Sequence, residues 1–238
     1  MIINTPFELP VLTSWQRNRL LGFAEQALSA QQQIINNTGK GILHYTLQKK
    51  RRHTRFKHYP PDDRIDLKSG AQYFYHCHRE NKKSLEHGHF HCFIRYKQIP
   101  KRIKPKPLSD WDKHIHNPMT HLVAIAMDRY SQPIRLFTVN RWITSEIWYD
   151  ALHAPYFLKR FNLSLQDDPY WQVLDKWVEA MIKLFSPQIV WLQQQRDLVM
   201  QNHLVKNPNI NVYDDESLEE ISEINIDLKQ QVKWLLKN

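Results

Sequence analysis

The spacing of apolar residues divides this chain into regions of different expected structure. Between residues 13 and 36 apolar side chains recur every three or four positions, which predicts an amphipathic helix, capped by Thr13 or Ser14, that lies against a sheet. Residues 41–48 predict a strand. Two antiparallel hairpins are predicted by four segments rich in aromatic and β-branched residues: 72–79 with 87–96, and 121–128 with 133–140.

From residue 141 onward the apolar period becomes helical again. Residues 142–161 and 167–185 predict helices, and a third covers residues 187–203. The second carries a stripe expected to lie in the core: Trp171, Leu174, Trp177, Met181 and Leu184. Residues 212–227 are acidic without clear periodicity, which is typical of a tail or of a segment folded over basic surface. A short helix is expected at the end.

Together these patterns predict an α+β fold, with a central antiparallel sheet of about four or five strands, an N-terminal helix and a helical C-terminal third. We expect a main domain over residues 1–190 and a helical, acidic extension over residues 191–238. The Pro- and Lys-rich segments before the first hairpin and between the two hairpins are expected to be irregular surface chain.

Composition excludes several classes of protein. The 238 residues are 42% hydrophobic and include eight Trp, enough to fill a core. Five Gly and no glycine-rich phosphate motif argue against dinucleotide and P-loop folds. No basic leader and no apolar window of membrane-spanning length is visible, so we expect a cytoplasmic protein without a membrane span. Cys77 and Cys92 are expected to be free thiols.

The net charge of +9 is concentrated in two places. Residues 49–58 and residues 95–107 each hold six Lys or Arg. Such runs suit an acidic partner, of which nucleic acid is the first candidate, although solvated loops give the same pattern.

Five histidines at alternating positions supply the strongest chemical signal. They are His76 and His78 on one predicted strand, and His87, His89 and His91 on the next. Alternation places each set on one face, and a loop centred between residues 78 and 87 would set His76 opposite His89 and His78 opposite His87. A register shifted by one residue would place His76 opposite Phe90 instead. Imidazole is the commonest protein ligand for metals, so the pattern predicts a divalent transition-metal site for Zn, Fe or Mn, while a His-rich chain without a metal is the simpler alternative.

Short motifs around these histidines resemble three kinds of metal or phosphate chemistry. The triplet His89-Phe90-His91 resembles the metal motif of nicking nucleases that initiate rolling-circle replication or conjugation. That resemblance implies a nucleophilic tyrosine at Tyr156, in a Tyr-x-x-Lys motif with Lys159. The same stretch is similar to a histidine-triad motif, with His89 as nucleophile. A cupin-like centre is the third possibility, and Glu86 or Glu80 would supply its acid.

Longer phrases resemble a family of bacterial proteins classed as a domain of unknown function. They include HYPPDD, YFYHCHR, EHGHFHCFIR and, near residue 140, NRW, and the similarity covers about residues 55–190. The resemblance implies that these phrases form one unit. It supplies no mechanism.

Three arginines near the predicted site are candidates for binding phosphate or another acidic partner: Arg79, Arg95 and Arg141. Ordinary ion pairs are the alternative. The sequence thus favours a metal-binding protein, with a metal-dependent phosphodiesterase or hydrolase as the enzymatic hypothesis. The hypothesis from another class is a non-enzymatic subunit of a protein assembly.

Overall fold

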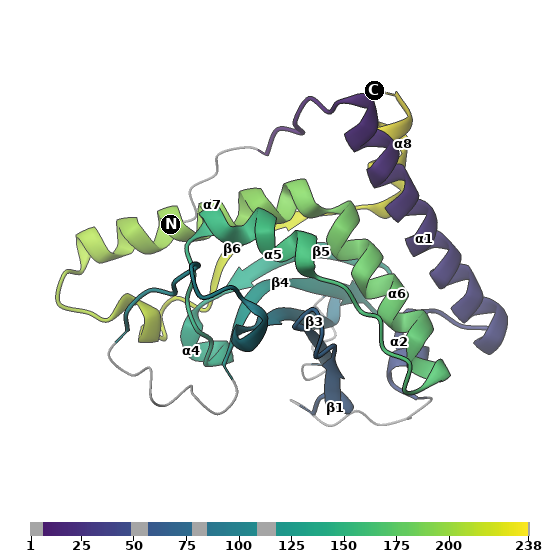
Figure 1. Ribbon diagram of the computed structural model, residues 1–238, viewed down its shortest axis with the longest axis horizontal. Helices are drawn as coiled ribbons and strands as arrows, with labels where there is room; N and C mark the ends of the chain where they lie inside the picture. The colour runs from purple at the N-terminus through teal and green to yellow at the C-terminus, as the bar shows by residue number, and fades with distance from the viewer. Residues whose placement is uncertain (1–6, 49–56, 78–84, 109–117, 238) are drawn as a thin grey trace.

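A six-stranded antiparallel sheet forms the centre of the computed structural model, which describes residues 7–48, 57–77, 85–108 and 118–237 (Figure 1). The strands lie in sequence order: β1 (Tyr59–Ile65), β2 (Ala71–Cys77), β3 (Glu86–Arg95), β4 (Met119–Asp128), β5 (Pro133–Val139) and β6 (Glu220–Asn225). The predicted α+β class is confirmed, with six strands instead of four or five. The two predicted hairpins are β2–β3 and β4–β5.

Helices occupy both ends of the chain. They are α1 (Ser14–Thr38), α2 (Ile42–Thr46), α4 (Arg141–Thr144), α5 (Ala154–Arg160), α6 (Pro169–Leu184), α7 (Ser186–Lys206) and α8 (Leu228–Lys237). Single 3₁₀ turns are η1 (Tyr96–Gln98), η2 (Ala151–His153) and η3 (Val212–Asp214). Thr13 caps α1 in a capping box with Gln16, and Gly39 ends it in the left-handed conformation. Asp168 caps α6 as its sequence indicates.

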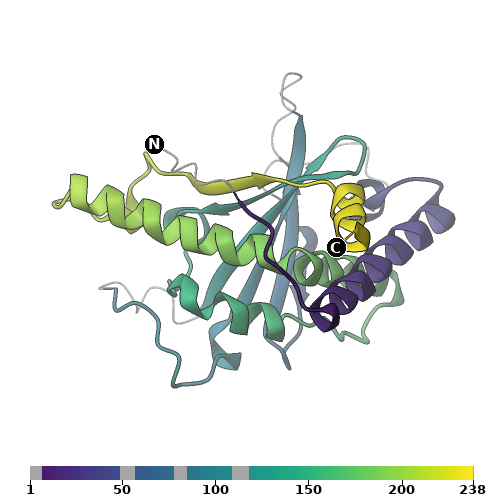
Figure 2. The same cartoon turned by 90° about the horizontal axis from the view of Figure 1, so that it is seen from above.

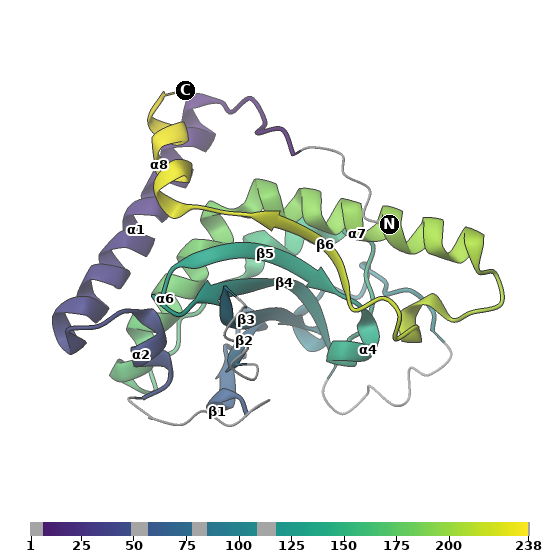
Figure 3. The same ribbon diagram turned by 180° about the vertical axis from the view of Figure 1, so that it is seen from behind.

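The main core lies between the sheet and the helices on one of its faces. Tyr73, Tyr75 and Phe90 are buried on this face, and the Phe90 ring lies 5.6 Å from that of Trp177 on α6. Figure 2 shows α7 running across the strands on the same side. Figure 3 shows the opposite face from behind, with the strands in view. All five residues of the predicted α6 stripe are buried, which confirms their place in the core.

Residues 41–48 do not form the predicted strand. They form the short helix α2, of which four residues are buried, and the Tyr45 ring stacks on Tyr170 with centroids 4.1 Å apart. A Cβ at Gly41 would lie 2.5 Å from the Ser131 Cβ, so the absence of a side chain lets this segment dock on the β4–β5 turn. Core packing has overridden the strand preference of these residues.

Three other expectations about the elements were wrong. Helix α1 packs mainly against α6, and then against α8 and α2, rather than against the sheet. Residues 142–161 are not one helix, because Ser145 adopts the left-handed conformation and ends α4, and helical structure resumes only at Ala151. Two segments expected to be irregular contribute strands, since β1 pairs with β2 and Met119–His121 begins β4.

The acidic segment supplies the last strand. Residues 220–225 form β6 and pair with β5, so part of the predicted extension is hydrogen-bonded into the sheet. Of the interpretations left open, a segment folded over basic surface is the one that fits, because Glu220 and Glu223 form ion pairs with Arg135. Cys77 and Cys92 are buried free thiols.

Candidate metal centre

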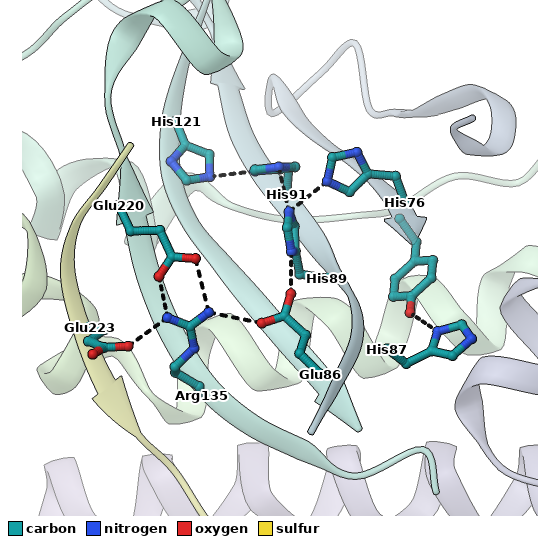
Figure 4. A network of polar contacts seen from close by, with 10 residues as sticks. His76, Glu86, His87, His89, His91, His121, Arg135, Glu220 and Glu223 are labelled. Atoms are coloured by element: carbon teal, nitrogen blue, oxygen red, sulfur yellow. Dashed lines mark hydrogen bonds and ion pairs between the residues drawn. The ribbon is translucent and has the colours of Figure 1, made fainter. Parts of the chain in front are cut away.

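Three histidines on two neighbouring strands converge on one point. His76 on β2 pairs directly opposite His89 on β3, as antiparallel numbering predicts, and His91 follows on the same face. The Nε2 atom of His89 lies 2.6 Å from Nε2 of His76 and 2.9 Å from Nε2 of His91 (Figure 4). Their ligand atoms all lie within 4.8 Å of one another, and no other such group forms among the described His, Cys, Asp and Glu side chains.

The spacing of these nitrogens suits a metal ion. In a tetrahedral zinc site the ligand nitrogens lie about 3.3 Å apart, because each lies about 2.0–2.1 Å from the ion. The distances from His89 Nε2 to the other two Nε2 atoms, 2.6 and 2.9 Å, are a few tenths of an ångström below that spacing. The group could therefore hold a metal, and the ring nitrogens do not by themselves decide which one.

A β-bulge next to the cluster turns His87, a predicted ligand, away from it and brings the Glu86 carboxylate beside His89. The pairing of β3 with β4 is irregular between Glu86 and Gly88, so alternation is interrupted there. Glu86 consequently lies on the face of His89, and its Oε1 atom is 2.7 Å from His89 Nδ1. A Cβ at Gly88 would lie 2.3 Å from the carbonyl oxygen of His76, so only glycine allows this close approach.

The bulge directs His87 away from the cluster. Its Nδ1 atom lies 2.7 Å from the hydroxyl of Tyr75, whose ring belongs to the main core (Figure 4). Strict alternation would have placed His87 beside His89, so the structure removes it from the predicted group. The predicted ligand His78 and the predicted phosphate-binding residue Arg79 lie outside the described residues.

Glu86 and its partners fix the orientation of His89. The His89 Nδ1–H donates to the Glu86 carboxylate, and Arg135 donates to the other carboxylate oxygen at 2.9 Å. Burial alone raises the pKa of Glu86, but the hydrogen bonds from His89 and Arg135 hold it below its usual value. A carboxylate that accepts from one imidazole nitrogen leaves the other nitrogen directed at the ligand position, the usual second-sphere arrangement of metal-binding histidines.

A fourth histidine extends the network at its inner end. Nδ1 of His91 lies 3.0 Å from Nε2 of His121, and both side chains are buried. Burial, with repulsion from neighbouring imidazoles, holds the pKa of His91 well below its usual value. Burial also lowers the pKa of His121 to about 3, and Arg196 adds to this effect. Both rings are therefore neutral near pH 7, the form that binds metals.

Sequence reasoning assigned no role to His121. It stands at the first position of the predicted strand 121–128, but hydrophobic alternation does not say which strand lies next to which. In the structure β4 pairs with β3 and places His121 opposite Phe93. Sequence reasoning also missed Arg135, which lies on β5 and donates a hydrogen bond to Glu86.

The nuclease motif does not join this site. Tyr156 on α5 packs against the main core on the helical side of the sheet, and with Lys159 it lines a separate pocket. The strands thus lie between this pair and the histidines. The attack on a metal-bound phosphate that the resemblance implies is not supported by this placement.

The other two predicted phosphate-binding arginines have partners of their own. Arg95 donates to the side-chain oxygen of Gln72 at 2.8 Å. Arg141 is buried and forms an ion pair with Asp214 at 2.8 Å, which is the simpler alternative that the sequence left open.

An α+β protein with a three-histidine group, two of whose members are buried, is a candidate metal-binding protein. The chain belongs to a family described as a domain of unknown function (DUF6969), whose model matches residues 23–226. No curated protein and no solved structure matches it. Among the described residues, no helix combines the length and apolar character that a membrane span requires.

Proposed function

We propose that this protein binds one divalent transition metal, Zn, Fe or Mn, through His76, His89 and His91, and that it is a metal-dependent hydrolase. The observation that carries the proposal is the meeting of three Nε2 atoms. One lone pair, or one N–H, on His89 cannot satisfy both neighbours at hydrogen-bond distance. A cation at their common point satisfies all three.

The number of ligands favours catalysis over a purely structural role. Structural zinc sites have four protein ligands, whereas catalytic sites have three and keep one position for water or substrate. A metal held there supplies a Lewis acid and acidifies a bound water. The protein residues would hold and orient the ligands, with Glu86 keeping the His89 Nδ1–H in place.

A phosphate ester is the substrate class favoured by the charge of the chain that follows β3. Directly after β3, the strand that carries His89 and His91, come four exposed cations: Lys97, Lys101, Arg102 and Lys104. Cations of this kind attract phosphorylated or nucleic-acid substrates. Tyr156 has no part in the proposal, which requires only water as nucleophile.

Elemental analysis tests the metal. We expect about one transition-metal ion per chain in purified wild-type protein and loss of that metal in the double variant His89→Ala, His91→Ala. The matched control is His87→Gln, which changes a neighbouring histidine outside the cluster and should keep the metal. A folded wild-type protein that takes up no Zn, Fe or Mn would contradict the proposal.

Hydrolysis is tested separately with bis(p-nitrophenyl) phosphate. The wild type and His87→Gln should cleave it when loaded with metal, and the double variant should not. Metal binding without cleavage would reduce the proposal to a metal-binding protein. A metal-free, inert chain that co-purifies with a stable protein complex would favour the interaction subunit.

A further inference from the structure

A second site lies on the helical side of the sheet, away from the histidines. An open pocket of about 650 Å³ is formed where the turn between β1 and β2 meets the end of α5 and the chain that follows it. The donors that line it include the side chains of Lys68, Tyr156, Lys159 and Arg160. The Tyr-x-x-Lys motif, which the histidine centre does not use, is thus part of a pocket of its own.

These donors have no acceptor among the residues that the structure describes. Among the described residues, no hydrogen bond or ion pair is made by the side chains of Lys68, Lys159 or Arg160, or by the hydroxyl of Tyr156. The Arg160 Nε atom is moreover buried without a partner. A buried donor without an acceptor costs free energy, and together with the charge of the exposed Lys68 and Lys159 it makes this pocket suited to an anion.

The one carboxylate in the pocket lining does not neutralise these cations. Asp66 Oδ1 accepts from the backbone N–H groups of Lys68 and Ser69, and Oδ2 accepts from that of Ser164. Burial alone raises the pKa of Asp66, but these backbone hydrogen bonds bring it below its usual value. Asp66 is therefore charged and committed to shaping the turn, and three cations face one carboxylate.

The cations are not needed to cap helix α5. Basic residues in a last helical turn often interact with free carbonyl groups. Here the Lys159 carbonyl accepts from Lys183 Nζ at 3.0 Å, and the Arg160 carbonyl accepts from Asn162 Nδ2 at 2.9 Å. The N–H of Phe161 donates to the carbonyl groups of Phe157 and Leu158. The Lys159 and Arg160 side chains are thus left for another partner.

We infer that this pocket binds a phosphate group, with Lys68, Lys159 and Arg160 supplying charge and the Tyr156 hydroxyl a further hydrogen bond. Lysine and arginine with a hydroxyl donor are a common set for a phosphate dianion. The site does not depend on the metal centre, because the sheet separates the two.

Isothermal titration with inorganic phosphate, in metal-free protein kept in chelator, tests the inference. We expect saturable binding at one site in the wild type, weakened by about tenfold or more in the double variant Lys159→Gln, Arg160→Gln. Lys68→Gln and Tyr156→Phe, which alter different parts of the pocket, should each weaken binding by a smaller factor. Circular dichroism checks that each variant is folded.

Two controls give the result its meaning. Lys229→Gln, Lys233→Gln removes two cations from exposed positions of α8, outside both proposed sites, and should bind phosphate like the wild type. His89→Ala, His91→Ala should also keep the binding, so failure of the metal proposal would leave this one standing. The inference is overturned if wild-type binding does not saturate, if the pocket variants bind equally well, or if either control loses binding.

Discussion

Two polar networks lie on opposite faces of the same sheet, and they differ in whether they join opposite charges or gather like groups. On the helical face Arg64 of β1 donates to both oxygens of Asp175 on α6, at 3.0 and 2.7 Å, and to both oxygens of Asp167. The Tyr73 hydroxyl donates to Asp175 at 2.8 Å. On the other face His89 meets two imidazoles with a single nitrogen.

The difference separates a structural network from a binding site. The Arg64 guanidinium donates four hydrogen bonds to two carboxylates of opposite charge, so the network joins β1 to α6 without any ligand. The histidine cluster brings like groups together, and under the proposed function a metal cation joins them. Loss of the first should therefore appear in the free energy of unfolding, and loss of the second in metal binding.

Breaking the Arg64 network should give the largest change in stability. Arg64→Met leaves Asp175 buried without its ion-pair partner, and we expect unfolding to become easier by about 3–5 kcal/mol. Metal content should stay that of the wild type. The control is Arg102→Met at an exposed position, expected to change stability by no more than about 0.5 kcal/mol. Urea unfolding measures the stability of both variants. Equal losses of stability in Arg64→Met and Arg102→Met would show that the Arg64 network does not stabilise the fold.

Loosening the support of His89 should weaken metal binding without abolishing it. Glu86→Gln keeps the shape of the side chain but removes its charge, and we expect metal affinity to fall about 10- to 100-fold. Glu220→Gln alters a half-exposed outer partner of Arg135. It should weaken the free energy of metal binding by less than about 1 kcal/mol. Competition against a chelator of known affinity measures both. A Glu86→Gln protein of unchanged affinity would argue against the orienting role of this carboxylate.

The neutral histidines should make the metal-free protein sensitive to acid. His121 has a folded pKa of about 3, against about 6.5 in the unfolded chain, so below pH 6.5 only the unfolded state binds its proton. Stability is then lost as the pH falls from about 6.5 toward 3. Between pH 7 and pH 5 His121 should account for a loss of about 2 kcal/mol.

A variant isolates this contribution from that of Glu146. Burial raises the pKa of Glu146 to about 7, so its contribution has the opposite sign and is lost as the pH rises through 7. Glu146 is present in both the wild type and His121→Asn, so its pH-dependent contribution to stability largely cancels in the comparison. The destabilisation caused by His121→Asn in chelator should therefore be smaller at pH 5 than at pH 7 by about 2 kcal/mol. An identical difference at both pH values would show that His121 is not held neutral.

Local sequence patterns were sufficient for part of the site. The β-hairpin of residues 72–96 follows from strand composition, and a loop centred between residues 78 and 87 then places His76 opposite His89, the pairing that the structure has. The placement of His91 follows from alternation. These are short-range consequences of backbone geometry, which any regular hairpin obeys.

Other features depended on packing between distant segments. The bulge that brings Glu86 in and turns His87 out is a local break in alternation, stabilised by the close fit of Gly88 against β2. His121 and Arg135 reach the site only because β4 and β5 are added beside β3. The acidic residues 220–225 gave no periodic signal, because β6 is an edge strand whose charged side chains pair with Arg135.

The sequence by itself determined the α+β class, the two central hairpins and the meeting of His76 with His89, because side-chain alternation and helical periodicity act over a few residues. Only the tertiary structure decided which strands are neighbours, which face the helices cover and where Tyr156 lies. Those choices depend on burying apolar surface across the whole chain, and the same hairpins could have been assembled in another order. The histidines of the candidate metal site are thus close in sequence, whereas His121 and Arg135 reach the site only through the tertiary fold.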